Sequence, residues 1–323
     1  MDTAVVVLSP SPSSSALVTR ELVTSARAFA EAATSAATRR AYQTAWRAFT
    51  AWCSDHAAEP LPAAPEAVAL YLTHLAEHGR TVASVDLALA AIAAAHRHAG
   101  LESPRSAAVV RAVARGIRRT LGVAPTQKAP VTVPALRAML AALPAGRLGV
   151  RDRALLLVGF ASALRRAELV ALTLEDVRYT DDGAVLTVRR SKTDQEGAGR
   201  VIGVPFGSTP ATCPVRALKA WTAAAGLTSG PIFRGVNRHG QVGGRLSARG
   251  VARVVQRAAA AVGLEAATFG GHSLRAGFAT SAALAGKSER AIMAQTGHQS
   301  VTIARRYIRQ ASVFTENAAA GLL

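Results

Sequence analysis

Four separated segments of the sequence place cationic or nucleophilic side chains in otherwise apolar surroundings. They are residues 163–169, 190–193 and 271–275, and Gly297 and His298 together with Tyr307. A phosphodiester under attack develops a dianionic transition state, which fixed cationic donors stabilise. The guanidinium of arginine stays charged and binds two oxygens at once. Arg165 and Arg275 are therefore the candidates for a clamp on a phosphate, although either arginine alone would more often form a surface ion pair.

Tyr307 is the candidate nucleophile. A phenol with a pKa near ~10 is almost wholly protonated at neutral pH, so it needs proton removal or strong stabilisation of the product. His272 is the candidate base or orienter. His298 precedes the tyrosine by nine residues, and Gly297 and Ser300 indicate a turn that folds both side chains towards one site. We expect His298 to donate a hydrogen bond to a phosphate oxygen, although a lone tyrosine in this setting would more often be a packing residue.

The composition favours a helix-rich, DNA-binding chain of two domains. At ~100 to 200 residues per domain, 323 residues suffice for two. Half of the residues are apolar but only 5% are aromatic, and the many alanines favour helix over strand. The net charge is +18 and the pI about 11.4. That pI exceeds the ~9 that suggests a nucleic-acid binder, although a GC-rich genome that favours arginine and alanine also explains it.

Other classes of protein find little support in the sequence. Cys53 and Cys213 form no CxxC pair, which argues against a disulfide framework or a structural zinc site. No apolar run approaches the ~18 to 20 residues of a membrane span, and the first residues lack the basic start of a secretory signal. We therefore expect a cytoplasmic protein that associates with the nucleoid when it binds DNA.

The amino-terminal part predicts a helical bundle with basic outer faces. Residues 1–30 contain a Ser/Pro-rich stretch and are expected to form a disordered tail. Within residues 31–121, amphipathic helices are expected to begin near Thr38, Pro65, Ala83 and Ser106. Polar residues at helical spacing line the first and fourth helices, at Arg39, Gln43 and Arg47 and at Arg111, Arg115 and Arg118. We expect these six to contact the DNA backbone and grooves, with a solvated helix face as the equally weighted alternative.

The carboxy-terminal part predicts a mixed domain. Three prolines and weak periodicity mark residues 122–134 as a linker. Residues 135–323 contain an apolar helix pair broken near Ser162 and a terminal apolar tail helix. Strands are expected at 184–188 and 201–204, and helices at 251–262, 274–285, 289–296 and 301–308. The predicted fold class is mainly α, with a helical-bundle DNA-binding domain followed by an α-rich catalytic domain with a small antiparallel sheet.

Taken in order, the polar segments resemble the tyrosine recombinase, or phage integrase, family. The resemblance covers nearly the whole chain from about Thr38, and the order arginine, lysine, HxxR, histidine and tyrosine is far more specific than any one piece. Within the family the chain looks closest to Cre-type recombinases, on residues 179–183, 191–193, 271–273 and 306–309. The resemblance implies the tyrosine recombinase fold, with a SAM-like core-binding domain over residues 31–121.

The resemblance also assigns roles around the clamp. The side chains of Arg165 and Arg166 would lie ~100° apart around a helix, so only one of them can aim at a given point, and the resemblance assigns Arg165. Glu168 lies three residues beyond Arg165, where it would brace that side chain or the shell of the site, and an ordinary i, i+3 pair is almost equally expected. His298 follows the broader family pattern, since Cre-type enzymes often carry tryptophan at that position.

Lys192 lies in the polar turn between the two expected strands. A lysine in such a turn is usually a solvated loop charge. By resemblance to the family, Lys192 is the general acid that protonates the leaving 5′-oxygen of the DNA strand.

The sequence therefore predicts a site-specific recombinase that cuts and rejoins double-stranded DNA through a 3′-phosphotyrosyl bond, without ATP, cofactor or metal ion. The family works as a tetramer on two sites, so we expect a homotetramer in which the apolar tail from Val313 docks on a neighbour. A type IB topoisomerase-like enzyme would use almost the same residues, and a catalytically idle DNA-binding protein would keep the fold. An integrase with an added arm-binding domain is less favoured, because the stretch before Thr38 is short and rich in serine and proline.

Overall fold

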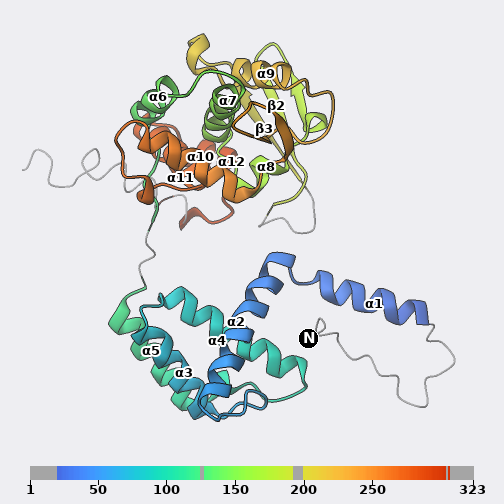
Figure 1. Cartoon of the computed structure of the whole chain (residues 1–323), viewed down its shortest axis with the longest axis vertical. Coiled ribbons are helices and arrows are strands. Elements are labelled where there is room, and N and C mark those ends of the chain that lie inside the picture. Colours follow the sequence, from blue (N-terminus) through green and yellow to red (C-terminus); the bar gives the residue numbers. More distant parts are fainter. Residues whose placement is uncertain (1–19, 124–126, 192–198, 303–304, 306–323) are drawn as a thin grey trace, which may run out of the picture. The chain divides into compact units, whose positions relative to one another are not determined.

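The computed structural model describes residues 20–123, 127–191, 199–302 and 305. The chain divides into two compact units, Met1–Thr126 and Gln127–Leu323 (Figure 1). Lys192, Tyr307 and the predicted tail from Val313 lie outside the described residues, as does most of the helix expected at 301–308.

Five α-helices form the described part of the first unit. They are α1 (Arg20–Ala32), α2 (Ala36–Asp55), α3 (Pro65–Glu77), α4 (Val82–His98) and α5 (Ala108–Leu121). The starts of α2 and α4 are capped by hydroxyl groups, because Ser35 accepts from the Thr38 nitrogen and Thr81 accepts from the Ser84 nitrogen. Proline opens α3, where its missing N–H costs nothing. Helix α2 packs on α4 and α3 packs on α5, which gives the bundle.

An aromatic core holds this bundle together. Phe49 of α2 is fully buried and lies 5.0 Å from the ring of Tyr71 on α3, centroid to centroid. Trp52 lies 5.4 Å from the same tyrosine ring. The buried His96 of α4 accepts a hydrogen bond from the backbone nitrogen of Ala63 at 2.9 Å, so its polar ring is satisfied inside the core.

Two sequence expectations near the unit's ends need correction. Residues 20–30 were expected to be tail, but they form most of α1, because the apolar residues after the Ser/Pro-rich stretch recur at helical spacing. Pro134 was placed in the linker, whereas it lies in the first turn of α6 (Val133–Ala141), which Thr132 caps. The residues just before α6 are already attached to the second unit, since the nitrogens of Ala129 and Val131 donate to carbonyls of that unit.

The second unit combines helices with two small antiparallel sheets. Besides α6, its described α-helices are α7 (Arg147–Ala161), α8 (Arg166–Ala171), α9 (Pro214–Ala224), α10 (Ala248–Ala260), α11 (Ser273–Leu284) and α12 (Glu289–Thr296). The strands are β1 (Val177–Tyr179), β2 (Gly183–Val188), β3 (Arg200–Pro205), β4 (Arg234–Val236) and β5 (Val242–Arg245). The three-stranded sheet has the order β1-β2-β3, with Leu186 opposite Ile202, and β4 pairs with β5. The mainly α fold class with small antiparallel sheets is confirmed.

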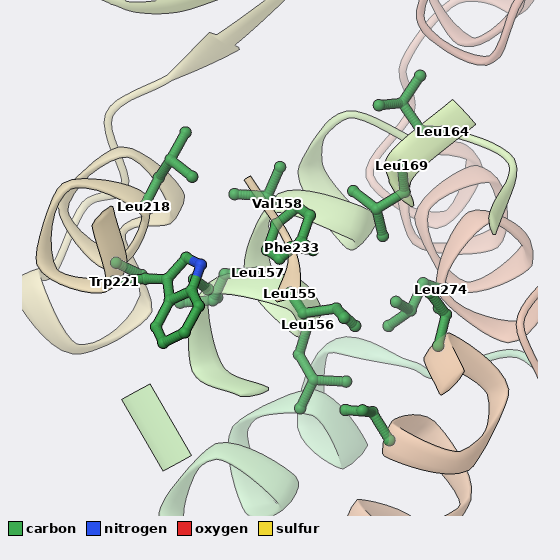
Figure 2. Packing of buried hydrophobic residues seen from close by; sticks show 14 of the residues in the cluster. Leu155, Leu156, Leu157, Val158, Leu164, Leu169, Leu218, Trp221, Phe233 and Leu274 are labelled. Carbon is green, nitrogen blue, oxygen red and sulfur yellow. The ribbon is translucent and has the colours of Figure 1, made fainter. Parts of the chain in front are cut away.

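Helix α7 is the centre of this unit's core. It packs against α6, α9, α10 and α11, so apolar residues occupy most of its circumference. Figure 2 shows residues 155–158 of α7 between Trp221 of α9 and Leu274 of α11. Burying side chains of this size contributes roughly 1.5 to 3 kcal/mol each. This packing fixes the end of α7, which is followed by the polar segment at residues 163–169.

One ionic cluster lies within the same core. The carboxylate of Asp152 on α7 is 1% exposed and accepts from the Nε of Arg151 at 2.6 Å and from the Nη2 of Arg257 on α10. Asp152 is thus a buried carboxylate held between two arginines, and it links α7 to α10.

No helix in the described part of the chain is long and apolar enough to cross a membrane.

Candidate active site

Arg165 stands at the start of α8, after a tight turn. Helix α7 ends at Ala161, and Ala163 takes a positive φ of 50°, which turns the chain sharply while its side chain stays buried. Glu168 then reaches back in the manner of a capping box. It accepts from the Arg165 backbone nitrogen at 3.0 Å and from Arg165 Nη1 at 2.6 Å. Both the backbone and the guanidinium of Arg165 are therefore fixed by one carboxylate, which is 5% exposed.

A second arginine, which no sequence motif indicated, shares this carboxylate. Arg200, the first residue of β3, donates from Nη2 to Glu168 Oε2 at 3.1 Å. Its Nη1 donates to the carbonyl of Gln295 near the end of α12, also at 3.1 Å. In the sequence, Arg200 shows only as a cation at the start of a strand, after a glycine-containing segment. A side chain in that position is usually solvated, so the pattern does not indicate its contacts.

Arg275 connects three of the polar segments. Its side chain, on the first turn of α11, is almost fully buried. Nη1 donates to the carbonyl of Ala163 at 2.8 Å and to the carbonyl of Thr296. The first contact reaches the turn before Arg165, and the second reaches the segment before His298. The structure thus brings Arg165, Arg275 and both histidines of the predicted site to one place.

His272 lies at the start of α11. Ser273 beside it accepts from the backbone nitrogen of Gly270 at 2.9 Å, which fixes the turn that carries the histidine. The surrounding protein, and then the positive charges of Arg166, Arg275 and Arg165, lower the pKa of His272 below its ordinary value. The ring is therefore neutral at pH 7 and can accept a proton.

His298 follows the end of α12. Gly297 closes the helix in the left-handed conformation, with φ of 65°. Burial is the first cause that lowers the pKa of His298 to about 4, followed by the charges of Arg275, Arg165 and Arg200. Its Nδ1 lies 3.0 Å from Thr296 Oγ1.

The hydrogen bonds of Thr296 indicate the tautomer of His298. The Thr296 hydroxyl lies 2.7 Å from the carbonyl of Ile292, and we assign its hydrogen to that bond. Oγ1 then accepts from Nδ1–H of His298, so Nε2 is the acceptor nitrogen of the neutral ring. The sequence predicts that His298 donates a hydrogen bond to a phosphate oxygen. With Nδ1 bonded to Thr296, that donation has to come from Nε2 and requires the protonated ring. A bound phosphate favours that form, because an anion raises the pKa of a neighbouring imidazole.

The six expected DNA-contacting residues lie on α2 and α5 of the first unit. Gln43, Arg47, Arg111 and Arg115 are exposed. The two others have protein partners, since Arg39 donates to the carbonyl of Thr34 at 2.7 Å and Arg118 pairs with Asp86 of α4. Among the residues that the structure describes, no group of three or more histidine, cysteine or acidic side chains is arranged to hold a metal ion.

Solved structures share this fold. A lambda integrase dimer bound to a COC′ core site superposes with a TM-score of 0.58 at 20% sequence identity, over 89% of this chain and 93% of that one. XerH site-specific recombinase bound to palindromic difH substrate gives a TM-score of 0.56 at 17% identity, over 80% of this chain and 71% of that one. The chain therefore shares its fold with lambda integrase and XerH recombinase.

Sequence comparison gives the family. The model of the phage integrase family matches residues 131–312. The chain is 37% identical to the integrase/recombinase xerD homolog of Selenomonas ruminantium over 286 residues, 87% of this chain and 84% of that protein. It is 27% identical to the recombinase cre of Escherichia phage P1 over 285 residues, 81% of each. The chain belongs to the phage integrase family, and its activity is that of a tyrosine recombinase, the site-specific recombination of DNA.

Proposed function

We propose that the second unit cuts one DNA strand by attack of Tyr307 Oη on the scissile phosphorus. The arrangement of Arg275 carries this proposal, because one buried guanidinium joins the turn before Arg165 to the segment before His298. Arg165 and Arg275 then supply a doubly charged clamp for the non-bridging oxygens, whose charge grows in the transition state. Neutral His272 accepts the phenolic proton of Tyr307.

The leaving group and the products complete the scheme. Lys192 gives its proton to the departing 5′-oxygen, which leaves as a hydroxyl, while the phosphorus stays bonded to Tyr307 as a 3′-phosphotyrosyl ester. The bond broken and the bond formed are both phosphate esters, so the ester stores the energy for rejoining. A 5′-hydroxyl of the partner strand reverses the step without ATP or a metal ion.

The assembly extends this proposal. The solved structures include recombinases bound to DNA sites, and we infer a homotetramer that holds two duplexes in the cytoplasm, with the apolar tail docked between protomers. Truncation after Gln310 should leave binding to one site unchanged while it weakens assembly of the two-duplex complex. Equal synapsis by the truncated and full chains would contradict this role of the tail.

The decisive experiment starts from the DNA that the protein itself selects. Genomic DNA that remains attached to the denatured protein is sequenced, and a duplex of the recovered sequence is incubated with fresh protein in EDTA. We expect a protein–DNA adduct that resists denaturation and carries a free 5′-hydroxyl. Loss of the adduct in EDTA with rescue by magnesium would indicate a different nuclease chemistry.

A further inference from the structure

The side chain of Arg200, the first residue of β3, is largely buried and contacts two other segments. Its side chain is 22% exposed, and its two terminal nitrogens donate to different segments, Glu168 on α8 and the Gln295 carbonyl on α12. Gln295 is itself held on the other side, because its Nε2 donates to the Ala161 carbonyl at 2.7 Å and to the Gly203 carbonyl at 3.0 Å. Strand β3 thereby holds the end of α12 at two points.

Each partner of Arg200 lies next to a residue of the proposed site, in contact with it or a few residues before it in the chain. Glu168 fixes both the backbone and the guanidinium of Arg165. Gln295 precedes the turn at Gly297 that carries His298. This turn lies directly on the guanidinium, because a Cβ atom added at Gly297 would come within 2.8 Å of Arg200 Cζ. The positive φ favours glycine at this position, and a Cβ there would displace the guanidinium of Arg200.

We propose that Arg200 is a positioning residue for strand cleavage, which couples the placement of Arg165 to the placement of His298. The inference rests on the proposed function of the site. A planar guanidinium suits this task, because its fork holds two acceptors in fixed, different directions, whereas an ammonium acts as a point charge on a flexible stem. Arg200 also contributes a positive charge that disfavours protonation of His298 in the DNA-free protein.

The chain contains a matched cluster that serves as control. Asp152 is also a buried carboxylate between two arginines, Arg151 and Arg257. Neither of these arginines is among the charges that lower the pKa of His272 or His298. Loss of Arg257, like loss of Arg200, removes one of two arginines from a buried carboxylate. It should therefore disturb the fold in a similar way but leave the proposed site unchanged.

The test compares Arg200→Met, Arg200→Lys and Arg257→Met with the wild-type chain. The probe is a nicked duplex of the sequence recovered from covalently bound genomic DNA, and the rate of adduct formation is measured at saturating protein together with the Kd for the duplex. We expect Arg200→Met to slow cleavage at least 10-fold with an unchanged Kd. Arg200→Lys should give an intermediate rate, and Arg257→Met the wild-type rate.

A second measurement is independent of cleavage. The pKa of His298 is followed by NMR in the DNA-free, histidine-labelled full chain, and His298→Gln identifies the signal. We expect a small rise of the pKa above about 4 in Arg200→Met, because burial, Arg275 and Arg165 remain as the larger causes, and no rise in Arg200→Lys and Arg257→Met. If Arg200→Met does not fold, Arg200→Lys decides the positioning role, because a lysine keeps the charge and loses the fork.

Each result distinguishes the two proposals. A wild-type cleavage rate in Arg200→Lys or Arg200→Met, or an equal slowing in Arg257→Met, would overturn the positioning role. Failure of the wild-type chain to form an adduct would instead refute the proposed function, and the NMR titration would then decide the influence of Arg200 on His298. An unmoved His298 pKa in a folded Arg200→Met protein would overturn that influence.

Discussion

Glu168 accepts hydrogen bonds from both the backbone nitrogen and the guanidinium of Arg165, at 3.0 and 2.6 Å. The carboxylate also pairs with Arg200, so a single buried anion compensates two cations. The negative charge of Glu168 therefore both positions Arg165 and stabilises the folded chain.

Glu168→Gln should slow cleavage and destabilise the chain. Glutamine keeps an acceptor but leaves two arginines without their buried counter-charge. Breaking a buried pair costs about 3 to 5 kcal/mol in unfolding free energy, and we expect cleavage to slow by roughly 10- to 100-fold as Arg165 loses its support. Denaturant unfolding and single-turnover cleavage measure the two effects.

Glu289→Gln is the control for that substitution. Glu289 pairs with Arg305 at 3.0 Å, and the arginine side chain is 58% exposed. Exposed pairs of this kind contribute ~0 to 1 kcal/mol, so both stability and cleavage should stay close to wild type. Equal effects of the two substitutions would show that the buried carboxylate has no special role.

Arg275→Ala should abolish most of the cleavage activity while the DNA still binds. Removing one donor from a transition state costs ~2.7 to 4 kcal/mol, which slows cleavage by ~100-fold or more. Loss of the contacts to Ala163 and Thr296 adds to that effect. A single-turnover rate near that of the wild-type chain would refute the assignment of Arg275 to the clamp.

Stability should depend on pH through His298. Its pKa is about 4 in the folded chain and ordinarily 6.5, so the unfolded chain binds more protons between these values. The unfolding free energy should therefore fall as the pH drops from about 6.5 to about 4, by up to about 2 kcal/mol after allowance for solvent screening. His272, whose pKa is also lowered, adds to the fall in the same direction.

His298→Gln isolates this contribution. A glutamine does not titrate, so the pH profile of denaturant unfolding should become flatter than that of the wild-type chain over the same window. His239→Gln, at an exposed turn, is the matched control and should keep the wild-type profile. An unchanged slope in His298→Gln would contradict the environment described for this ring.

Lys192 is tested through the leaving group. A thiol has a pKa of ~8.5, so a 5′-bridging sulfur can depart without a proton. Lys192→Ala should be severely slow on ordinary DNA and close to wild type on the 5′-phosphorothiolate. Arg275→Ala should show no such selective rescue, because the non-bridging oxygens need its charge whichever atom departs. Rescue of both variants, or of neither, would remove Lys192 from the role of general acid.

How much the sequence predicts depends on the range of the interactions. Helix α4 was expected to begin near Ala83 and spans Val82–His98, since its apolar periodicity and its cap are local. Strand β5 was missed, because it contains two glycines and shows no alternation of apolar and polar residues. The role of Arg275 was inferred from the order of the motifs. The contacts of Arg200 could not be predicted, because Glu168 and Gln295 become its neighbours only after β3 and α12 have packed.

The proposed function requires that Tyr307 becomes covalently joined to DNA. The most direct measurement incubates a nicked duplex of the recovered site with the wild-type chain and with Tyr307→Phe, digests the products and locates the attached nucleotide by mass spectrometry. We predict a nucleotide on Tyr307 through its 3′-phosphate in the wild-type chain, and no adduct with Tyr307→Phe despite equal DNA binding. An adduct of undiminished yield in Tyr307→Phe, or a nucleotide on another residue, would contradict the account.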